Sequence, residues 1–504
     1  MEASGTFLKN GVKNGVTKGV ANGAAAKARP FLINNEWVEG SGEPFVSTNP
    51  ADGSEIARIS AASPADIDSA VAAARAALSN PAWRDLKPHE RARLLYRVGE
   101  LIDADLERLA RVQMQDNGKT LKECRQQVAS AAGTFRYYAG ACETFESEVT
   151  PPRGNYWTMT VREPVGVVGA ITAWNSPVTL DAHKLAPILA AGNAAILKGS
   201  EVTPLISLEY AEIVLKAGFP PGVVNVIAGA GEPGCWLVEH PGVDMISFTG
   251  GTRTGSAIAA TAGRLLKPVV LELGGKSPNI VFADADLKKA IRGTGDGIFS
   301  GGGQSCIAGS RIFVQKTIFK EFLEGLRDFA RGYRVGAPES ADTDLGPLAS
   351  FPHREHVERY VEIGRKEGAT VVAGGARPTG RIFDKGAFYP ATVLTDVDNS
   401  ARVCREEIFG PVAVVLPFDN EDDLMRQAND TDFGLASGIW TGDYQKAWRV
   451  ARGLRAGTVW INTYKQSSIS TPFGGFKQSG IGREKGLQGM LAYTETKGIF
   501  WGLG

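Results

Sequence analysis

The chain has 504 residues, with 55 Lys and Arg against 55 Asp and Glu, so its formal net charge is zero. That length predicts several domains with large cores, and a hydrophobic content of 43% excludes an intrinsically disordered protein. Zero net charge disfavours a nucleic-acid-binding protein, and no apolar run reaches the roughly 20 residues of a membrane-spanning helix. Five cysteines without a C-x-x-C pair predict no metal site and no disulfide framework, and they favour a reducing, cytoplasmic location.

The first 29 residues differ from the rest in composition. They contain five basic residues and one acid, with repeated Asn-Gly and Lys-Gly steps. Two interpretations stand, a flexible tail and a targeting peptide. The flexible tail is favoured, because Gly and Asn oppose a stable helix and a transit peptide is richer in Arg.

Regular elements begin at Phe31. Residues 31–38 read as one strand that ends in a turn at Glu39-Gly40. Ser63-Pro64-Ala65-Asp66 is typical of a helix start, with an N-cap serine, proline in the first turn and an acid after it. A second long helix is expected from Pro88 to about Met114.

From Val165 onward, short apolar runs alternate with helical stretches. Such runs are typical of parallel strands that are covered on both faces, so the pattern predicts a doubly wound α/β sheet. A helix at 286–298, a strand at 311–314 and a helix at 318–333 repeat the pattern and predict a second α/β unit. The strands expected in the first unit are 165–173, 194–197, 223–227, 245–248 and 268–273, with 279–282 following them.

Cys306 is the first candidate for chemistry. It follows Gly301-Gly302-Gly303-Gln304-Ser305, a run that lets the backbone approach a ligand and leaves the thiol uncrowded. A thiolate is a strong nucleophile near neutral pH. The alternative is an inert buried cysteine, which is how we interpret the other four.

Glu272 interrupts an apolar strand and precedes Gly274-Gly275. Burial there would raise the pKa of the carboxyl toward the range of a general base. The alternative is a structural carboxylate paired with Lys276 or Lys267, and the residues alone do not choose between the two.

Asn175 follows the expected strand 165–173 and precedes a helix expected at 179–190. An uncharged amide donor at a strand's carboxyl end suits the oxyanion that forms when a nucleophile attacks a carbonyl. Capping of the helix is the alternative.

Two glycine patterns could cradle a nucleotide diphosphate. Residues 229–234 fit G-x-G-x-x-G literally, and Gly250-Gly251-Thr252 open a helix whose N–H groups could hold phosphate. At another strand end, Lys198 offers a cation. Glu201 offers a carboxylate that could bind both ribose hydroxyls and repel a 2′-phosphate.

In combination, these motifs resemble the aldehyde dehydrogenase superfamily, specifically its NAD(P)-dependent, non-acylating branch. The resemblance extends from about Phe31 to the C-terminus. The motifs that carry it occur in the order Phe248-Thr249-Gly250, Leu271-Glu272-Leu273-Gly274-Gly275-Lys276-Ser277-Pro278, Gly303-Gln304-Ser305-Cys306, Glu406-Glu407-Ile408-Phe409-Gly410-Pro411-Val412 and Pro472-Phe473-Gly474-Gly475.

The resemblance implies oxidation of an aldehyde to its carboxylic acid. Cys306 would form a thiohemiacetal whose oxyanion is held by the Asn175 amide and the Cys306 N–H. Glu272 would activate the water that hydrolyses the resulting thioester. Lys184 and Glu484 match positions that relay the released proton.

The resemblance also implies an NAD site, with NADP disfavoured by Glu201. It discounts residues 229–234 as a phosphate cradle. The sequence departs from the family pattern at Gly251, Arg253 and Gly301, where serine, an acid and asparagine are common, and we expect cofactor binding to survive. The implied cofactor residues are Trp174, Lys198, Glu201, Gly250, Gly251, Thr252, Glu407 and Phe409.

Two other functions compete. A coenzyme-A-acylating dehydrogenase would not need a base, so Glu272 counts against it. A catalytically silent relative would lack one of Cys306, Glu272 and Asn175.

For the substrate we expect a medium aliphatic or aromatic aldehyde, since no Arg lies beside Cys306, although Lys465 could contact a carboxylate. The expected pocket wall comprises Ser176, Leu180, His183, Ser305, Ile307 and Ser467.

The resemblance further implies the domain organisation. Residues 30–145 and 165–274 would form a Rossmann-like NAD-binding domain, and residues 275–489 the catalytic domain. Residues 146–164 and 490–504 would form a small β element that joins subunits into a homodimer or homotetramer, since an apolar terminal strand needs a partner.

Overall fold

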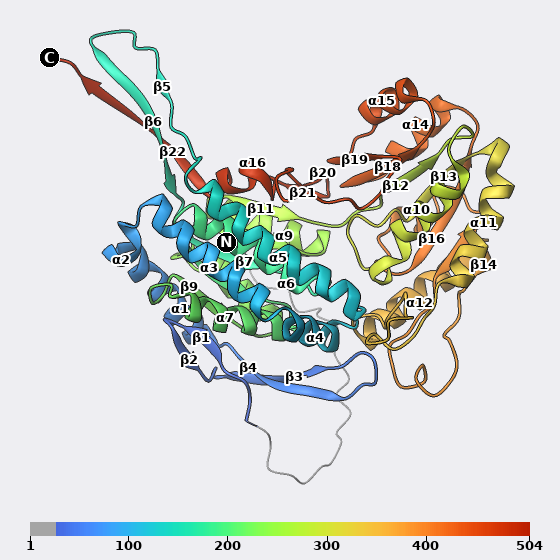
Figure 1. Cartoon of the computed structure of the whole chain (residues 1–504), viewed down its shortest axis with the longest axis horizontal. Coiled ribbons are helices and arrows are strands. Elements are labelled where there is room, and N and C mark those ends of the chain that lie inside the picture. Colours follow the sequence, from blue (N-terminus) through green and yellow to red (C-terminus); the bar gives the residue numbers. More distant parts are fainter. Residues whose placement is uncertain (1–26) are drawn as a thin grey trace, which may run out of the picture.

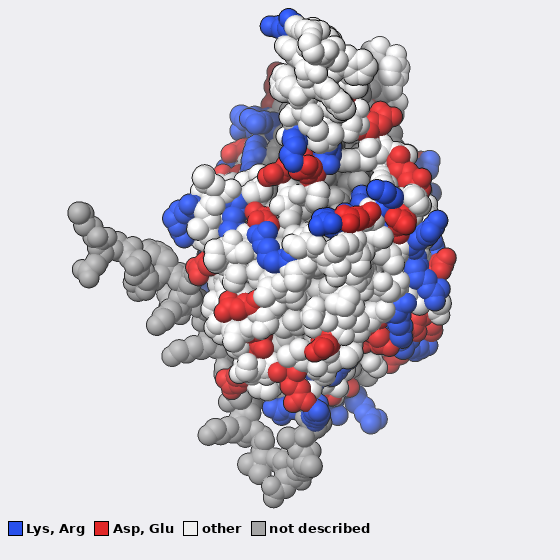
Figure 2. All heavy atoms as spheres, turned by 90° about the vertical axis from the view of Figure 1, so that its left-hand side faces the viewer, with Lys and Arg blue, Asp and Glu red and all other residues white. Residues whose placement is uncertain are grey.

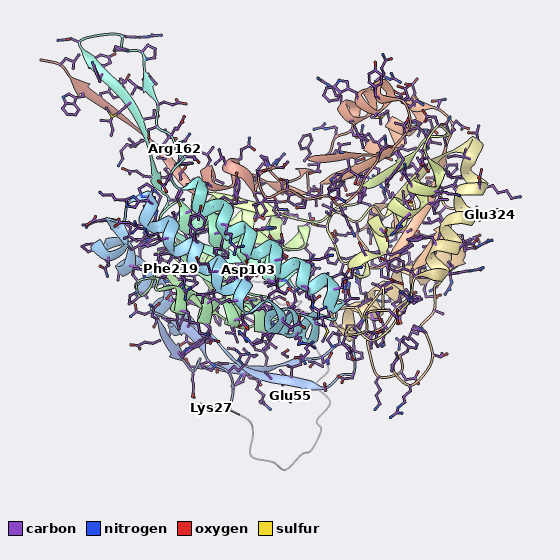
Figure 3. The ribbon with its side chains drawn as sticks, viewed as in Figure 1. Lys27, Glu55, Asp103, Arg162, Phe219 and Glu324 are labelled. Atoms are coloured by element: carbon purple, nitrogen blue, oxygen red, sulfur yellow. The ribbon has the colours of Figure 1, made fainter. Side chains whose placement is uncertain are left out.

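A computed structural model describes residues 27–504, starting at Lys27, which is labelled in Figure 3. The predicted flexible tail therefore lies outside the described residues except for its last three. Of these, Arg29 pairs with the backbone of Arg58 and Ser60, and its guanidinium contacts Glu209 at 3.1 Å. The structure confirms the predicted mixed α/β fold with parallel sheets (Figure 1). Within residues 27–504, no helix is long and apolar enough to cross a membrane.

The first sheet has eight strands and a parallel centre. In the sheet, β7 lies between β8 and β10, so the chain connections reverse direction between β7 and β10. Sheets with such a reversal bind ligands in the crevice at the carboxyl ends of the two strands. In sheet order the strands are β2 (Glu36–Val38), β1 (Phe31–Ile33), β9 (Val224–Ile227), β8 (Ala194–Lys198), β7 (Val167–Ile171), β10 (Met245–Thr249), β11 (Val269–Glu272) and β21 (Gly480–Ile481).

Helices cover both faces of this sheet, and β7, β8 and β9 are fully buried as a result. One group of helices that pack together comprises α1 (Pro64–Ser79), α8 (Gly231–Glu239) and α9 (Thr252–Arg264). The other comprises α3 (Pro88–Ala104), α4 (Leu106–Asn117), α5 (Leu121–Ala141), α6 (Pro177–Ala190) and α7 (Leu205–Ala217).

The second sheet has seven strands and two separate apolar cores, one on each face. Alternate residues of β13 divide between them: Phe313 packs with α12, α14 and α15, whereas Ile312 and Val314 pack with α10 and α11. The strands in order are β14 (Thr370–Ala373), β15 (Thr392–Thr395), β16 (Val412–Phe418), β13 (Arg311–Gln315), β12 (Pro278–Val281), β18 (Ala436–Trp440) and β19 (Thr458–Ile461). The helices are α10 (Leu287–Phe299), α11 (Phe319–Gly332), α12 (Phe351–Lys366), α14 (Glu421–Asn429) and α15 (Tyr444–Gly453).

A three-stranded arm of β5 (Val149–Thr150), β6 (Tyr156–Pro164) and β22 (Thr494–Gly502) projects from the body (Figure 1). Its base lies near Arg162, whose guanidinium donates to Thr496 (Figure 3). Figure 2 shows that the arm, at the top of that view, carries few charged side chains. Its exposed apolar side chains are Val149, Trp157, Ile499, Phe500, Trp501 and Leu503.

The remaining elements are short or peripheral. They are β3 (Gly42–Thr48), β4 (Glu55–Ala61), β17 (Phe433–Gly434), β20 (Phe476–Lys477), α2 (Pro81–Arg84), α13 (Arg402–Arg405), α16 (Gly486–Leu491) and the 3₁₀ turns η1 (Ser300–Gly303) and η2 (Lys316–Ile318).

Two predicted elements were wrong in detail. The single strand expected at 31–38 is a hairpin, because Asn34 and Asn35 adopt φ of 55° and 61° and reverse the chain. The long helix expected from Pro88 divides at Asp105 into α3 and α4. The helix start at Ser63 is confirmed, with a capping box between Ser63 and Asp66.

Candidate active site

The candidate site lies where the carboxyl edge of the first sheet meets the amino edge of the second. β11 ends at Glu272, and the five residues that follow run directly into β12. Cys306 lies before β13, and Glu407 lies before β16. Backbone contact brings these segments together, since a Cβ at Gly275 would lie 2.2 Å from the Cys306 carbonyl oxygen.

A left-handed glycine turn delivers Cys306 to this junction. Gly301, Gly302 and Gly303 adopt φ of 69°, 70° and 65°, a conformation that side chains with a Cβ disfavour. Gly303 also packs so closely that a Cβ would lie 2.1 Å from the Gly410 carbonyl oxygen. The three glycines therefore set the path of the backbone into Cys306, which is half-buried.

Asn175 contacts the same loop from the first sheet. It follows β7 on the strand beside the reversal, and its Nδ2 donates to the Gln304 carbonyl at 3.0 Å. The Gln304 side chain is buried and bonded to Ala349 N and the Gly301 carbonyl. Asn175 does not cap α6, whose N-cap is Ser176. The Asn175 amide thus contacts the backbone two residues before Cys306.

Glu272 is buried, with 4% of its surface exposed, and neither carboxylate oxygen has a hydrogen-bond partner within the described residues. Burial, reinforced by the charge of Glu484, holds the pKa of this carboxyl well above its usual value. The alternative pairings with Lys267 and Lys276 are wrong. Lys267 donates to the carbonyls of Val238 and His240, and the Lys276 ammonium has no partner in the described chain.

The surroundings of the Cys306 thiol favour its protonated form. Burial, together with the charges of Glu407 and Glu272, raises its pKa to about 12. Below that pKa, the thiolate fraction therefore increases about tenfold for each unit by which the pH rises. In cofactor-free enzyme we expect alkylation of Cys306 by iodoacetamide, followed by mass spectrometry of its peptide, to accelerate steadily up to about pH 10. A plateau below about pH 8 would contradict this, because it would reveal a stabilised thiolate.

Lys184 and Glu484 form a buried ion pair with an N–O distance of 2.7 Å. The Lys184 ammonium also donates to Ser247 Oγ at 3.0 Å, and Ser247 is bonded to the Tyr493 hydroxyl at 2.8 Å. Because the charge of Glu484 raises the pKa of Glu272, the pair is electrostatically linked to the candidate base.

Glu407 and the aromatic residues beside it form one wall of the junction. Glu407 Oε1 accepts a hydrogen bond of 2.8 Å from Gly275 N–H, and burial raises the pKa of its carboxyl to about 7. Trp174 packs edge-on against Phe409, with ring centroids 5.2 Å apart. His353, which the sequence analysis missed, contacts Trp174 and bonds the Phe409 carbonyl at 2.8 Å. No sequence motif marks His353.

The carboxyl ends of β8 and β10 fit an adenine dinucleotide. The buried Lys198 ammonium lies 3.5 Å from the carboxylate of Glu201, which is partly exposed. α9 has no side-chain cap at Gly251, where an added Cβ would meet nothing within 4 Å. The first N–H groups of this helix can therefore receive a diphosphate, with Gly250 and Thr252 beside them. The residues present fit the cofactor that the sequence implies.

Two lysines interact electrostatically with the thiol. Lys465, which could have contacted a substrate carboxylate, instead donates to the Ser300 carbonyl and hydroxyl at 3.2 and 3.0 Å. Lys485, absent from the predicted pocket wall, donates to Ser467 Oγ at 2.9 Å. Its charge lowers the pKa of the Cys306 thiol.

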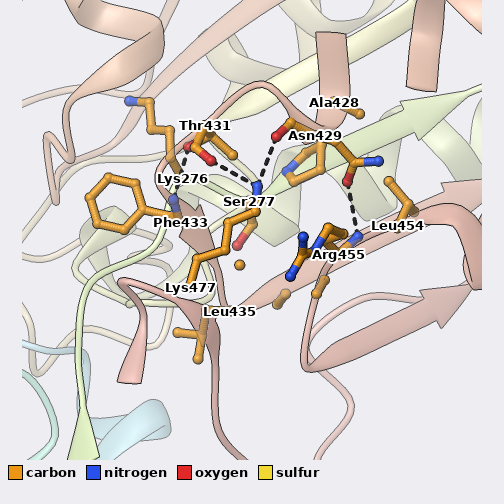
Figure 4. Close-up of a pocket in the computed structure, with 14 residues that line it drawn as sticks. Lys276, Ser277, Ala428, Asn429, Thr431, Phe433, Leu435, Leu454, Arg455 and Lys477 are labelled. Carbon is orange, nitrogen blue, oxygen red and sulfur yellow. Dashed lines mark hydrogen bonds between the residues drawn. The ribbon is translucent and has the colours of Figure 1, made fainter. Parts of the chain in front are cut away.

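A crevice beyond Lys276 and Ser277 is too small for a substrate (Figure 4). It encloses about 10 Å³, which is room for no more than one water molecule. Lys477 closes it by donating to the carbonyls of Asn429 and Thr431, both at 2.8 Å. The two hydrogen bonds of Lys477 therefore hold together segments that line this crevice.

The chain is similar in sequence and structure to known proteins. The profile of the aldehyde dehydrogenase family matches residues 37–499. The chain is 42% identical over 475 residues to DhaS of Bacillus subtilis, which covers 94% of this chain and 95% of that protein. An NAD+ complex of an aldehyde dehydrogenase from Bacillus cereus superposes with a TM-score of 0.93 at 41% identity, over 95% of this chain and 97% of its own. A betaine aldehyde dehydrogenase from Staphylococcus aureus, also with NAD+, gives a TM-score of 0.92 at 38% identity, over 94% of each chain.

Proposed function

This chain belongs to the aldehyde dehydrogenase family, and on that premise we propose that Cys306, Glu272 and Asn175 carry its chemistry. The family membership and the NAD-bound relatives make it an NAD-dependent enzyme that oxidises an aldehyde to its carboxylic acid. The residue roles below are our proposal.

The Cys306 thiol gives its proton to water, and the sulfur attacks the aldehyde carbon, whose carbonyl electron pair moves to oxygen to give the oxyanion of a thiohemiacetal. The Asn175 amide and the Cys306 backbone N–H donate to the oxyanion, which stabilises the charge where it develops. NAD, when bound, accepts the hydride that this carbon releases. Cys306 then holds the acyl group as a thioester.

Glu272 completes the turnover. Its carboxylate takes a proton from water, the oxygen attacks the thioester carbon, and the Cys306 sulfur leaves as the acid is released. Glu272 must then lose that proton. The buried Lys184–Glu484 pair, whose charge acts on Glu272, is our proposed route for it.

The unpartnered burial of Glu272 is the observation that carries the proposal. A carboxyl with a raised pKa and no structural partner suits a general base. A coenzyme-A-acylating enzyme needs no such base, and a silent relative has no reason to retain the cost of burying it.

An assay of NADH formation tests the proposal. Purified enzyme is given NAD and a panel of aliphatic and aromatic aldehydes, with and without coenzyme A. We expect activity that does not need coenzyme A and free carboxylic acid as the product. A strict requirement for coenzyme A, or silence in a folded protein that binds NAD, would overturn it.

The cofactor site is proposed to prefer NAD over NADP through Glu201. Lys198 and Glu201 hold the adenine ribose, Trp174, Gly250, Gly251 and Thr252 the diphosphate, and Glu407 and Phe409 the nicotinamide side. The exposed carboxylate of Glu201 would lie close to a 2′-phosphate and repel it, at a cost of about 1–4 kcal/mol.

Replacing Glu201 with Gln is therefore expected to raise kcat/KM for NADP relative to NAD by about tenfold or more. The amide keeps the shape of the side chain and removes the charge. Steady-state kinetics with each cofactor measure the ratio. Glu212→Gln, on the exposed side of α7, is the matched control and should leave the ratio unchanged. A ratio that Glu201→Gln does not move would place the ribose elsewhere.

The domain boundaries and assembly are also proposals. The first sheet supports an NAD-binding domain of residues 30–145 and 165–274, and the second supports a catalytic domain of residues 275–489. The apolar side chains of the arm formed by residues 146–164 and 490–504 support a homodimer or homotetramer. Analytical ultracentrifugation of the full chain tests the assembly, and a monomer would contradict it.

A cytoplasmic location is proposed from the cysteines, all five of which are free. Fractionation of the source cells tests it, and recovery with an oxidising compartment would contradict it.

A further inference from the structure

Lys485 is a half-buried cation without a counter-ion. Its ammonium donates to Ser467 Oγ at 2.9 Å and lies over the Phe473 ring, 5.2 Å from the centroid. Within residues 27–504, no carboxylate forms an ion pair with it. The residue also adopts a φ of 61°, which is unfavourable for a side chain with a Cβ. Among the described residues, no charged partner therefore compensates for the burial and the backbone strain of Lys485.

Backbone contacts bring Lys485 next to the candidate base. Phe473 exchanges two backbone hydrogen bonds with Glu484, of 2.7 and 2.8 Å, so the segments before Lys485 and around Phe473 are paired. The next residue, Gly474, lies against Glu272, where an added Cβ would be 2.8 Å from Oε1. Lys485 therefore directly follows a segment that is paired with Phe473, the residue before the glycine that lies against Glu272.

The electrostatics agree with that geometry. Burial lowers the pKa of Lys485, while the charge of Glu484, and those of Cys306 and Glu272 when they are ionised, oppose the shift. Burial lowers the pKa of His183, a residue of the predicted pocket wall, and the charge of Lys485 lowers it further. The charge of Lys485 therefore acts on the thiol, on the base and on the wall of the substrate pocket.

We propose that Lys485, together with the Ser467 hydroxyl, binds a carboxylate at the far end of the aldehyde substrate. An ammonium and a hydroxyl side by side are suitable donors for a carboxylate, and such a substrate would supply the missing counter-ion. The inference rests on the proposed function and names the substrate class of the same site. It replaces the expectation of a neutral aldehyde, which took account of Lys465 but not of Lys485.

Lys465 does not serve this purpose in the structure. It is held by Ser300, on the other side of the glycine turn, and Glu123 and Asp296 add negative charge around it. Lys485, by contrast, contacts a hydroxyl and an aromatic face among residues 27–504, and both leave its charge available.

The test compares aldehydes of matched shape. Wild-type enzyme is assayed with 5-oxopentanoate against pentanal and with 3-formylbenzoate against benzaldehyde, and the readout is the ratio of kcat/KM values in each pair. We expect the carboxylate to be preferred. Lys485→Met should lower the ratio about 10- to 100-fold, mainly through KM, because a hydrogen bond to a charged group is lost.

Three further variants separate specificity from structure. Lys485→Arg keeps the charge and should retain most of the preference. Lys485→Glu should bring the ratio below one. Lys316→Met removes an exposed lysine that contacts Asp419, remote from the junction, and should leave the ratio unchanged.

The outcomes distinguish this inference from the proposed function. Oxidation of neutral and carboxylate aldehydes with equal kcat/KM would overturn the inference alone, as would a preference that survives Lys485→Met. Equal losses on both members of each pair would also overturn it, because Lys485 would then act on the thiol or the base. Wild-type enzyme inactive on all four aldehydes would count against the proposed function itself.

Discussion

Replacing Cys306 with alanine is expected to lower NADH formation from every aldehyde by about 10⁴-fold or more. The variant lacks the only sulfur that the glycine turn delivers to the junction between the sheets. Alanine keeps the Cβ and is smaller than cysteine, so the fold should be retained. Stopped-flow and steady-state NADH absorbance measure the loss, with circular dichroism and NAD titration as checks on folding and cofactor binding.

Cys235→Ala is the matched control. Cys235 is a free, half-buried thiol on α8, and the same substitution there should change kcat/KM less than twofold. Activity that persists in Cys306→Ala would contradict the thiohemiacetal mechanism. A comparable loss in Cys235→Ala would show that the chemistry is not confined to one thiol.

Glu272→Gln is expected to separate the two halves of the reaction. The amide keeps the shape of the side chain but cannot take a proton from water, so the thioester should form and then persist. We expect a burst of about one NADH per active site, followed by a steady rate about 10²- to 10⁴-fold below wild type. Rapid-quench kinetics measure the burst, and intact-mass spectrometry should show the acyl group on Cys306.

A matched carboxylate far from the junction provides the control. Glu324 is exposed on α11, at the edge of the molecule in Figure 3, and Glu324→Gln should behave as wild type. Glu272→Gln with an undiminished steady rate would be inconsistent with a role for Glu272 in hydrolysis. Loss of the burst as well would instead place Glu272 in the formation of the thioester.

The sequence could predict the strands that are buried on both faces. The runs at 165–173 and 194–197 consist almost wholly of apolar residues, and they become β7 and β8 with trimmed ends. Parallel strands between two helix layers allow few polar residues, so their composition is diagnostic.

Elements that depend on local backbone choices were harder to predict. Asn34-Asn35 lacks the glycine of a common hairpin turn, yet both asparagines accept the left-handed conformation. α5 was not predicted at all. It contains many small residues and includes Gly133 and Gly140, so it lacks a strong apolar stripe, and packing against α3 and α6 stabilises it instead.

The candidate site divides in the same way. Cys306, Glu272 and Asn175 each stand beside glycines or at strand ends, which are visible in the sequence. Lys485 and His353 have no such marker, because their neighbours come from distant parts of the chain. The contact between Lys485 and Ser467 depends on two loops that meet only in the folded protein.

The pairing of β21 with β11 bears on how the enzyme is synthesised. Gly480 and Ile481 pair with Glu272 and Leu271, and Ser479 fixes the next two residues by accepting from Leu273 N–H and donating to the Gly274 carbonyl. A ribosome must therefore release about 200 residues beyond Glu272 before the strand that ends there gains its outer neighbour. A nascent chain can expose its thiol to cellular aldehydes well before it can build the surroundings of its base.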